Sequence, residues 1–273
     1  MMTRIAYVPL ATYPEAAGDA AVTAVLRWTA TLGLRLDATV FEVEIPQPVT
    51  PFGSVLLDIP DLVRRAEEKS RADADRIAGL LLAAGADVGC SRRRVVVGAA
   101  EDVAVAEARL RDLAVLPVVP GAMHDMALAL VFGAGRPVLL LPVEAAPQAV
   151  RHLAVAWDGS RVAARALRDG LDLLEPGGKV SVLTVTGEKS LAATAAAEDV
   201  VRMLGRKGLR AEAVIAQAQG RAVSAALQDS ARIAGADLLA MGGFGHSRLR
   251  DFVLGGVTKD MLSEAAMPLL LSH

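Results

Sequence analysis

The sequence predicts an α/β protein made of two tandem domains, each an open parallel sheet of the Rossmann-like type. Hydrophobic residues make up 53% of the 273 residues and aromatic residues only 3%, so the core consists mainly of Ala, Leu and Val. Short aliphatic runs alternate with long Ala-rich segments, which is typical of buried parallel strands joined by crossover helices. The same order occurs twice, so we expect a duplication with two copies related by a pseudo-twofold axis.

The second copy is placed at residues 150–273. Its strands are expected at His152–Asp158, Lys179–Thr186, Ala211–Gln217, Asp237–Gly243 and Pro268–Ser272. Its helices are expected at Ser160–Leu174, Ser190–Lys207, Val223–Ala234 and Thr258–Ala265. Glycines follow these helices at Gly177, Gly178, Gly208 and Gly235, where helix stops belong.

The first copy is placed at residues 1–145. Its strands are expected at Arg4–Leu10, Leu36–Ile45, Arg93–Gly98, Asp112–Val119 and Pro137–Pro142, with helices at Ala16–Leu32 and Asp61–Ala84. The Pro-rich segment Pro46–Pro60 is a loop insertion that the second copy lacks. The linker Glu144–Val150 is short and contains Pro147, so we expect the halves to dock.

Composition excludes several classes of protein. A net charge of −2 disfavours a nucleic-acid binder, and the run Arg92–Arg94 is interpreted as a solvated lead-in to a strand. A single cysteine, Cys90, fits a reducing compartment and is interpreted as a small buried thiol. No signal peptide and no apolar stretch of about 18 residues is evident, so we expect a cytoplasmic protein without a membrane partner.

The most informative stretch runs from Met241 to Thr258, between an expected strand and an expected helix. Its glycines at 242, 245, 255 and 256 allow backbone to approach a ligand. Open α/β sheets bind ligands at the carboxyl ends of their strands, and the N–H groups of such a loop and of the helix that follows favour phosphate oxygens. Thr258 can cap that helix or donate a hydroxyl.

Comparison between the copies strengthens this interpretation. The segment from Asp237 to Pro268 is about six residues longer than the matching segment from Asp112 to Pro137, whose glycines do not reproduce the spacing. Because both copies complete the same fold, the extra loop is not needed for folding. A purely structural loop remains the alternative.

A second difference lies at the end of the first strand of each copy. Alignment of RIAYVPLAT with HLAVAWDGS places Leu10 opposite Asp158. A carboxylate at this position can accept hydrogen bonds from a ribose hydroxyl or an adenine amino group. The alternative is that Asp158 or Ser160 only caps the next helix.

These residues resemble the universal stress protein family, and the duplication resembles its tandem-domain members, whose fold is related to the adenine nucleotide alpha hydrolases. ATP-binding members carry Gly-x-x-Gly, nine residues, then Gly-(Ser/Thr), and Gly242, Gly245 and Gly255 match this spacing. The resemblance implies that Asp158 meets the adenosine, that Val185 borders the adenine, and that Met241 and Gly242 line the pocket. It also implies contacts to ribose and phosphates from Gly245, Gly255, Gly256, Val257 and Thr258.

One residue departs from the family pattern, because Gly256 stands where the family has Ser or Thr. A lost hydroxyl donor costs about 1 kcal/mol, or roughly fivefold in affinity. His246, Arg248 and Arg250 lie inside the loop and can reach phosphates, with a solvated loop charge as the alternative for the arginines. The sequence contains no P-loop, no dinucleotide fingerprint, no metal-ligand spacing and no nucleophile beside a base, so we expect no catalytic residues and no protein-bound metal.

The resulting hypothesis is a stress-response or regulatory protein that binds ATP, with or without Mg²⁺, in its second domain and hydrolyses it slowly at most. The alternative is an interaction module of the same fold that binds no nucleotide. The aliphatic last strands PVLLL and PLLLS are expected to pair within the chain. Further association of two chains into a homodimer is possible. The sequence decides neither this nor the identity of a protein partner.

Overall fold

A computed structural model describes residues 3–46, 59–118, 124–186, 191–218, 220–243, 256–263 and 265–273. The first half contains β1 (Ile5–Ala11), α1 (Asp19–Thr31), β2 (Arg35–Glu44), α2 (Ile59–Ala83), β3 (Val88–Val96), α3 (Ala100–Ala108), β4 (Leu113–Val118), α4 (His124–Gly133) and β5 (Val138–Pro142). The second half contains β6 (His152–Ala156), α5 (Arg161–Leu171), β7 (Lys179–Thr186), α6 (Leu191–Arg206), β8 (Arg210–Gln217), α7 (Val223–Ile233), β9 (Leu238–Gly242), α8 (Gly256–Ser263) and β10 (Leu269–Ser272).

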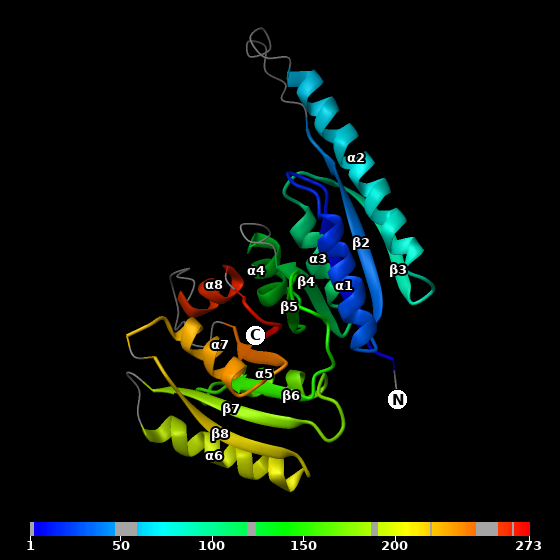
Figure 1. The fold of residues 1–273 in the computed structure, drawn as a ribbon. Helices are drawn as coiled ribbons and strands as arrows, with labels where there is room; N and C mark the ends of the chain where they lie inside the picture. The colour runs from blue at the N-terminus through cyan, green and yellow to red at the C-terminus, as the bar shows by residue number, and fades with distance from the viewer. Residues whose placement is uncertain are drawn as a thin grey trace.

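All ten of these strands form one sheet in the order β3-β2-β1-β4-β5-β10-β9-β6-β7-β8. Strands within each half are parallel, whereas β5 and β10 are antiparallel, with Leu140 opposite Leu269 and Val138 opposite Leu271. The mirrored order confirms two tandem open sheets related by a pseudo-twofold axis between β5 and β10 (Figure 1). The expected pairing of the two last strands within the chain is also confirmed.

The duplication extends to individual hydrogen bonds. Asp112 N donates to Ile5 O at 2.9 Å and Asp237 N donates to His152 O at 2.8 Å. In return Asp112 Oδ2 accepts from Ile5 N at 2.7 Å, and Asp237 Oδ2 accepts from His152 N at 2.8 Å. Ile5 therefore corresponds to His152, which makes Ala11 the counterpart of Asp158. The sequence alignment that paired Leu10 with Asp158 was wrong by one residue.

Helices cover both faces of the sheet. One core cluster joins α1 and α2 with α5 and α6, and contains Trp28, Ile77, Leu153 and Leu204. The other joins α3 and α4 with α7 and α8, and contains Leu130, Leu227, Met241 and Met261. Both clusters run across the two halves, so burial of aliphatic surface stabilises the halves together.

Most expected elements are present within a few residues of their expected ends, and β7 coincides with its expected range. Gly208 and Gly235 adopt φ values of +79° and +75° after α6 and α7, as glycine does at helix C-termini. The sequence did not predict α3 or α4, and β3 begins at Val88 rather than Arg93. Most of the Pro46–Pro60 insertion, residues 47–58, lies outside the described residues.

The arginine run lies inside β3 and does not precede it. Arg92 pairs with Glu42 at 2.5 Å, Arg93 with Glu107 at 3.1 Å and Arg94 with Glu44 at 3.3 Å. Paired guanidinium groups do not form a free basic patch. No helix within the described residues is both long and apolar enough to cross a bilayer.

Candidate functional site

The candidate site lies where the direction of strand connection reverses in the second half. From β6 the chain continues through α5 to β7 and then β8, but it returns through α7 to β9 on the other side of β6. Ligands of open α/β folds bind outside the carboxyl ends of the strands at such a switch point. Strand β9 ends at this edge, and in the sequence the glycine loop follows it.

Register brings several predicted site residues to this edge. Ala156 pairs with Leu183, and Trp157 N donates to Leu183 O at 2.7 Å. Asp158 and Val185 each lie two residues beyond that pair, Asp158 just after the end of β6 and Val185 on the neighbouring strand β7. Val155 pairs with Ala240, so Met241 and Gly242 continue β9 on the opposite side of β6.

Asp158 is exposed and shapes the turn into α5. Its Oδ1 accepts a hydrogen bond from Ser160 N at 2.9 Å, and Ser160 Oγ accepts from Ala163 N at 3.2 Å, so Ser160 is the N-cap. Gly159 has a φ of +77°, which an L side chain rarely adopts. The capping role that the sequence suggested for this pair is therefore present, with the Asp158 carboxylate exposed at the strand end.

Gly242 has a packing reason to be glycine. A Cβ atom there would lie 2.5 Å from Val162 Cγ2, 2.7 Å from Val162 C and 2.8 Å from Ala163 N. The first turn of α5 thus rests directly on the end of β9. Gly242, one of the three motif glycines, is therefore required for packing, independently of any contact with a ligand.

An apolar wall stands on the α7–α8 face of the edge. Met241 is buried in that core cluster, and Val185 and Val257 pack against it while remaining partly exposed. Thr258 is buried in the first turn of α8. Gly256 begins α8, is exposed, and a Cβ atom there would meet nothing within 4 Å. The structure therefore brings Asp158, Val185, Met241, Gly242 and the start of α8 to one edge.

Five predicted residues cannot be placed. Gly245, His246, Arg248, Arg250 and Gly255 lie outside the described residues. The direct phosphate contacts therefore remain predictions, resting on the motif spacing.

The corresponding edge of the first half is built differently. Ala11, the counterpart of Asp158, has no carboxylate. Beyond it, buried Thr12 donates to Phe41 O at 2.6 Å and lies 2.6 Å from Ser70 Oγ on α2, which also accepts from Val43 N at 2.9 Å. These hydroxyl groups fasten α2 across the ends of β1 and β2.

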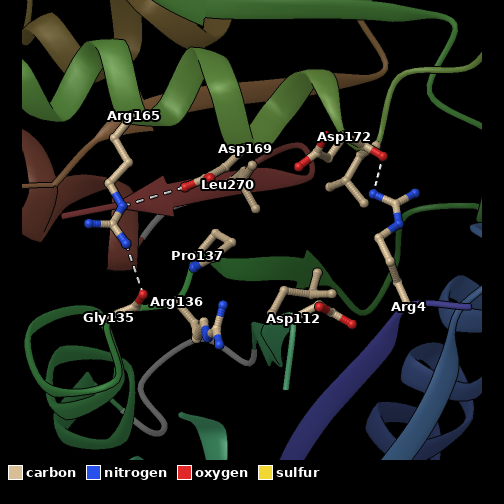
Figure 2. Close-up of a pocket in the computed structure, with 11 residues that line it drawn as sticks. Arg4, Asp112, Gly135, Arg136, Pro137, Arg165, Asp169, Asp172 and Leu270 are labelled. Carbon is tan, nitrogen blue, oxygen red and sulfur yellow. Dashed lines mark hydrogen bonds and ion pairs between the residues drawn. The ribbon is translucent and has the colours of Figure 1, made fainter. Parts of the chain in front are cut away.

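A separate hollow lies between the halves, and Figure 2 shows its lining. Around a volume of about 170 Å³, one side is lined by Arg165, Asp169 and Asp172 of α5 and its C-cap, and the other side by Arg4, Asp112 and Arg136. Ligand pockets of drug-sized molecules occupy about 300–1,000 Å³, so this hollow is too small for a nucleotide. Arg165 Nη2 donates to Gly135 O at 2.9 Å and Arg4 Nη1 donates to Asp172 O, so its arginines tie the halves together.

Within the part of the chain that the structure describes, neither the His152–Ser181 pair nor Cys90 is arranged as an activated nucleophile. Ser181 Oγ donates to Glu212 at 2.8 Å and lies 2.8 Å from His152 Nε2, so the imidazole donates to Ser181 and cannot take its proton. Burial raises the pKa of the half-buried Cys90 thiol, which disfavours a reactive thiolate. Among the described residues, no group of three His, Cys, Asp or Glu side chains could hold a metal ion.

One contact at the site carries no signal in the sequence. Gly243, the last described residue before the loop, abuts Val131 of α4, with a Cβ atom at Gly243 lying only 3.1 Å from Val131 Cγ1. Val131 belongs to the other half, more than a hundred residues away, so no local pattern reveals it.

Comparisons with known proteins agree with this geometry. Residues 149–273 match the model of the universal stress protein family. A universal stress protein from Archaeoglobus fulgidus has a similar fold, with a TM-score of 0.69 and 15% identity over 97% of this chain and 95% of that chain. A putative universal stress protein from Pseudomonas aeruginosa has a TM-score of 0.56 and 14% identity over 99% and 93%. No curated protein matches the chain.

Proposed function

We propose that the chain is a tandem-domain member of the universal stress protein family and that its second half binds ATP or a related adenine nucleotide. Residues 149–273 match the model of that family, and the same fold precedes them in the first half. In this proposal residues 150–273 form the nucleotide-binding domain of a stress-response protein. Residues 1–145 form a domain of the same fold without a nucleotide motif.

The observation that carries the proposal is the position of the glycine-rich segment. Its described ends, Gly242 on β9 and Gly256 on α8, lie at the switch point of the second half, and Gly242, Gly245 and Gly255 keep the family spacing. The first half has the same switch point between β1 and β4 but neither the spacing nor the carboxylate.

Each described residue has a role that suits an adenine nucleotide. The exposed carboxylate of Asp158 accepts from a ribose hydroxyl or the adenine amino group, and Val185, Met241 and Val257 give the base an apolar wall. The first-turn N–H groups of α8 lack helical acceptors and are directed toward phosphate oxygens. Mg²⁺, where it takes part, is held mainly by those phosphates, as is usual for this ion.

The loop residues complete the proposed contacts. Gly245 and Gly255 bring backbone N–H groups close to the ribose and phosphates, and His246, Arg248 and Arg250 supply positive charge or hydrogen bonds to phosphate. At Gly256 the family hydroxyl is missing, but the backbone N–H remains. The expected cost is about 1 kcal/mol, which weakens binding roughly fivefold and does not abolish it.

Calorimetric titration and thermal unfolding with ATP and Mg²⁺ test the proposal. Gly245→Val is the informative variant, because Gly242→Val would disturb the packing of α5 on β9. Gly205→Ala is the matched control: it lies in α6, and a Cβ atom there meets nothing within 4 Å. We expect Gly245→Val to lose the ATP-dependent rise in unfolding temperature and Gly205→Ala to keep it.

Two results would reject the proposal. The absence of both heat and a thermal shift at millimolar ATP would favour a module that binds no nucleotide, in which the glycines only shape a turn. Equal stabilisation of Gly245→Val and the wild-type chain by ATP would mean that the nucleotide does not bind at the glycine loop. Gly242 already has a structural reason to be glycine, because it packs against α5.

A further inference from the structure

Gly243, the residue that precedes the glycine loop and is here called the loop root, is held by hydrogen bonds from the last strand, β10, and from His273 after it. Gly243 N donates to Ser272 O at 2.8 Å, and Gly243 O lies 3.0 Å from Nδ1 of His273, which must therefore carry the proton. Both backbone polar groups of Gly243 are thus bonded. These bonds fix the direction in which the chain leaves β9.

Helix α4 of the first half supports this root from the side. Val131 abuts Gly243, as described above, and the Phe132 ring packs edge-on against the His273 imidazole with centroids 5.1 Å apart. Phe132 is 49% exposed, so it contributes less to the core than its buried neighbour Leu130. Its ring instead covers the residue whose imidazole bonds Gly243.

The same helix also packs against α8, the helix that follows the loop. Helices α4 and α8 are in contact and lie side by side in Figure 1. Met126 and Leu130 of α4 share a core cluster with Met261 and Leu262 of α8. The residue before the loop, Gly243, and the helix that follows the loop, α8, therefore both pack against a helix of the half that lacks the motif.

We propose that Val131 and Phe132 of the first half are positioning residues for the nucleotide loop of the second half. The inference rests on the proposed nucleotide function of that loop. If Gly243 is already fixed before binding, less conformational entropy is lost when a nucleotide binds at this edge of the sheet. A backbone residue that is mobile in the free protein must be ordered when the nucleotide binds, and the entropy lost in ordering one residue weakens binding about tenfold.

The test uses Phe132→Ala, with Ile233→Ala as the control. Ile233 is 85% exposed at the end of α7, near the opposite edge of the sheet from the loop. Two quantities are measured on the full chain: the Kd for ATP by calorimetry, and the exchange rate of the Gly243 amide without nucleotide by NMR. A third variant, Phe132→Tyr, keeps an aromatic ring against His273.

We expect Phe132→Ala to weaken ATP binding about tenfold and to accelerate exchange of the Gly243 amide, while Phe132→Tyr and Ile233→Ala behave as wild type. Unchanged Kd and unchanged exchange in Phe132→Ala would overturn the inference, and so would faster exchange with an unchanged Kd. If the wild-type chain does not bind ATP, the proposed function fails separately. The amide exchange then decides whether Phe132 holds the loop root.

Discussion

The contact between Gly242 and α5 predicts a large loss of stability when a single methyl group is added. In Gly242→Ala the new Cβ lies 2.5–2.8 Å from three atoms of Val162 and Ala163. Ordinary carbon contacts are about 3.5–4.0 Å, so the first turn of α5 would have to retreat by roughly 0.7–1.0 Å to reach even the lower end of that range. Two of the three atoms are backbone, so a change of rotamer cannot relieve them.

Overpacking of this kind costs about 1–3 kcal/mol of unfolding free energy, and we expect the upper part of that range because backbone must move. The matched control is Gly256→Ala in the first turn of α8, where a Cβ meets nothing within 4 Å. Alanine is favoured over glycine in helices by roughly 0.5–1 kcal/mol, so the control should be neutral or stabilising. Two substitutions of the same type should therefore change stability in opposite directions.

Urea unfolding followed by circular dichroism measures both effects. Val162→Ala removes the Cγ2 contact but leaves the two backbone contacts. In the Val162→Ala background, Gly242→Ala should therefore cost less unfolding free energy than in the wild-type background, but the cost should not vanish. If Gly242→Ala stays within about 0.5 kcal/mol of wild type, the close approach of α5 to β9 is not real.

Three further predictions concern the site and the core. Gly256→Ser restores the family hydroxyl where there is space for it, so calorimetry should show ATP binding about fivefold tighter; equal or weaker binding would count against a phosphate at this turn. Ser160→Ala removes the N-cap of α5 and should lower the unfolding free energy by about 1 kcal/mol, whereas Ser160→Asp should retain most of it; equal losses in urea unfolding would contradict the capping role. Burial lowers the pKa of His152 below its ordinary value of about 6.5, so as the pH falls the unfolded chain takes up this proton before the folded chain does, and stability decreases. Between pH 7.5 and pH 5.5 the unfolding temperature should therefore fall less for His152→Gln than for wild type, and an equal fall in both would refute the argument.

The aliphatic strands could be read from the sequence because parallel strands buried on both faces are continuous apolar runs. Lys179–Thr186 is an example whose ends coincide with β7. The start of β3 was missed because β3 is an edge strand with mostly exposed residues, and its Val-Gly-Cys-Ser beginning has no apolar run. Helix α4 was missed because it is apolar on several sides, which suits a helix between the sheet and α8 and hides the helical period.

The candidate site divides in the same way. The turn at Asp158 and Ser160 is local, so its capping chemistry could be predicted from four residues. The contacts of Gly242 with α5 and of Gly243 with α4 join residues 79 or more positions apart, and nothing local encodes them. A glycine motif in sequence therefore combines positions needed for packing with positions free to face a ligand. Only coordinates separate the two.

The antiparallel junction between β5 and β10 explains why one half supports the loop of the other. Val138 at the start of β5 lies opposite Leu271 near the end of β10, so the amino edge of the first half adjoins the carboxyl edge of the second. Helix α4 ends just before β5 and therefore lies beside the end of β9, where Val131 contacts Gly243. The pseudo-twofold axis makes this support reciprocal in principle, because α8 precedes β10 in the same way. Only the second half has the glycine spacing, so in this symmetric fold the first half supports a loop that it does not itself contain.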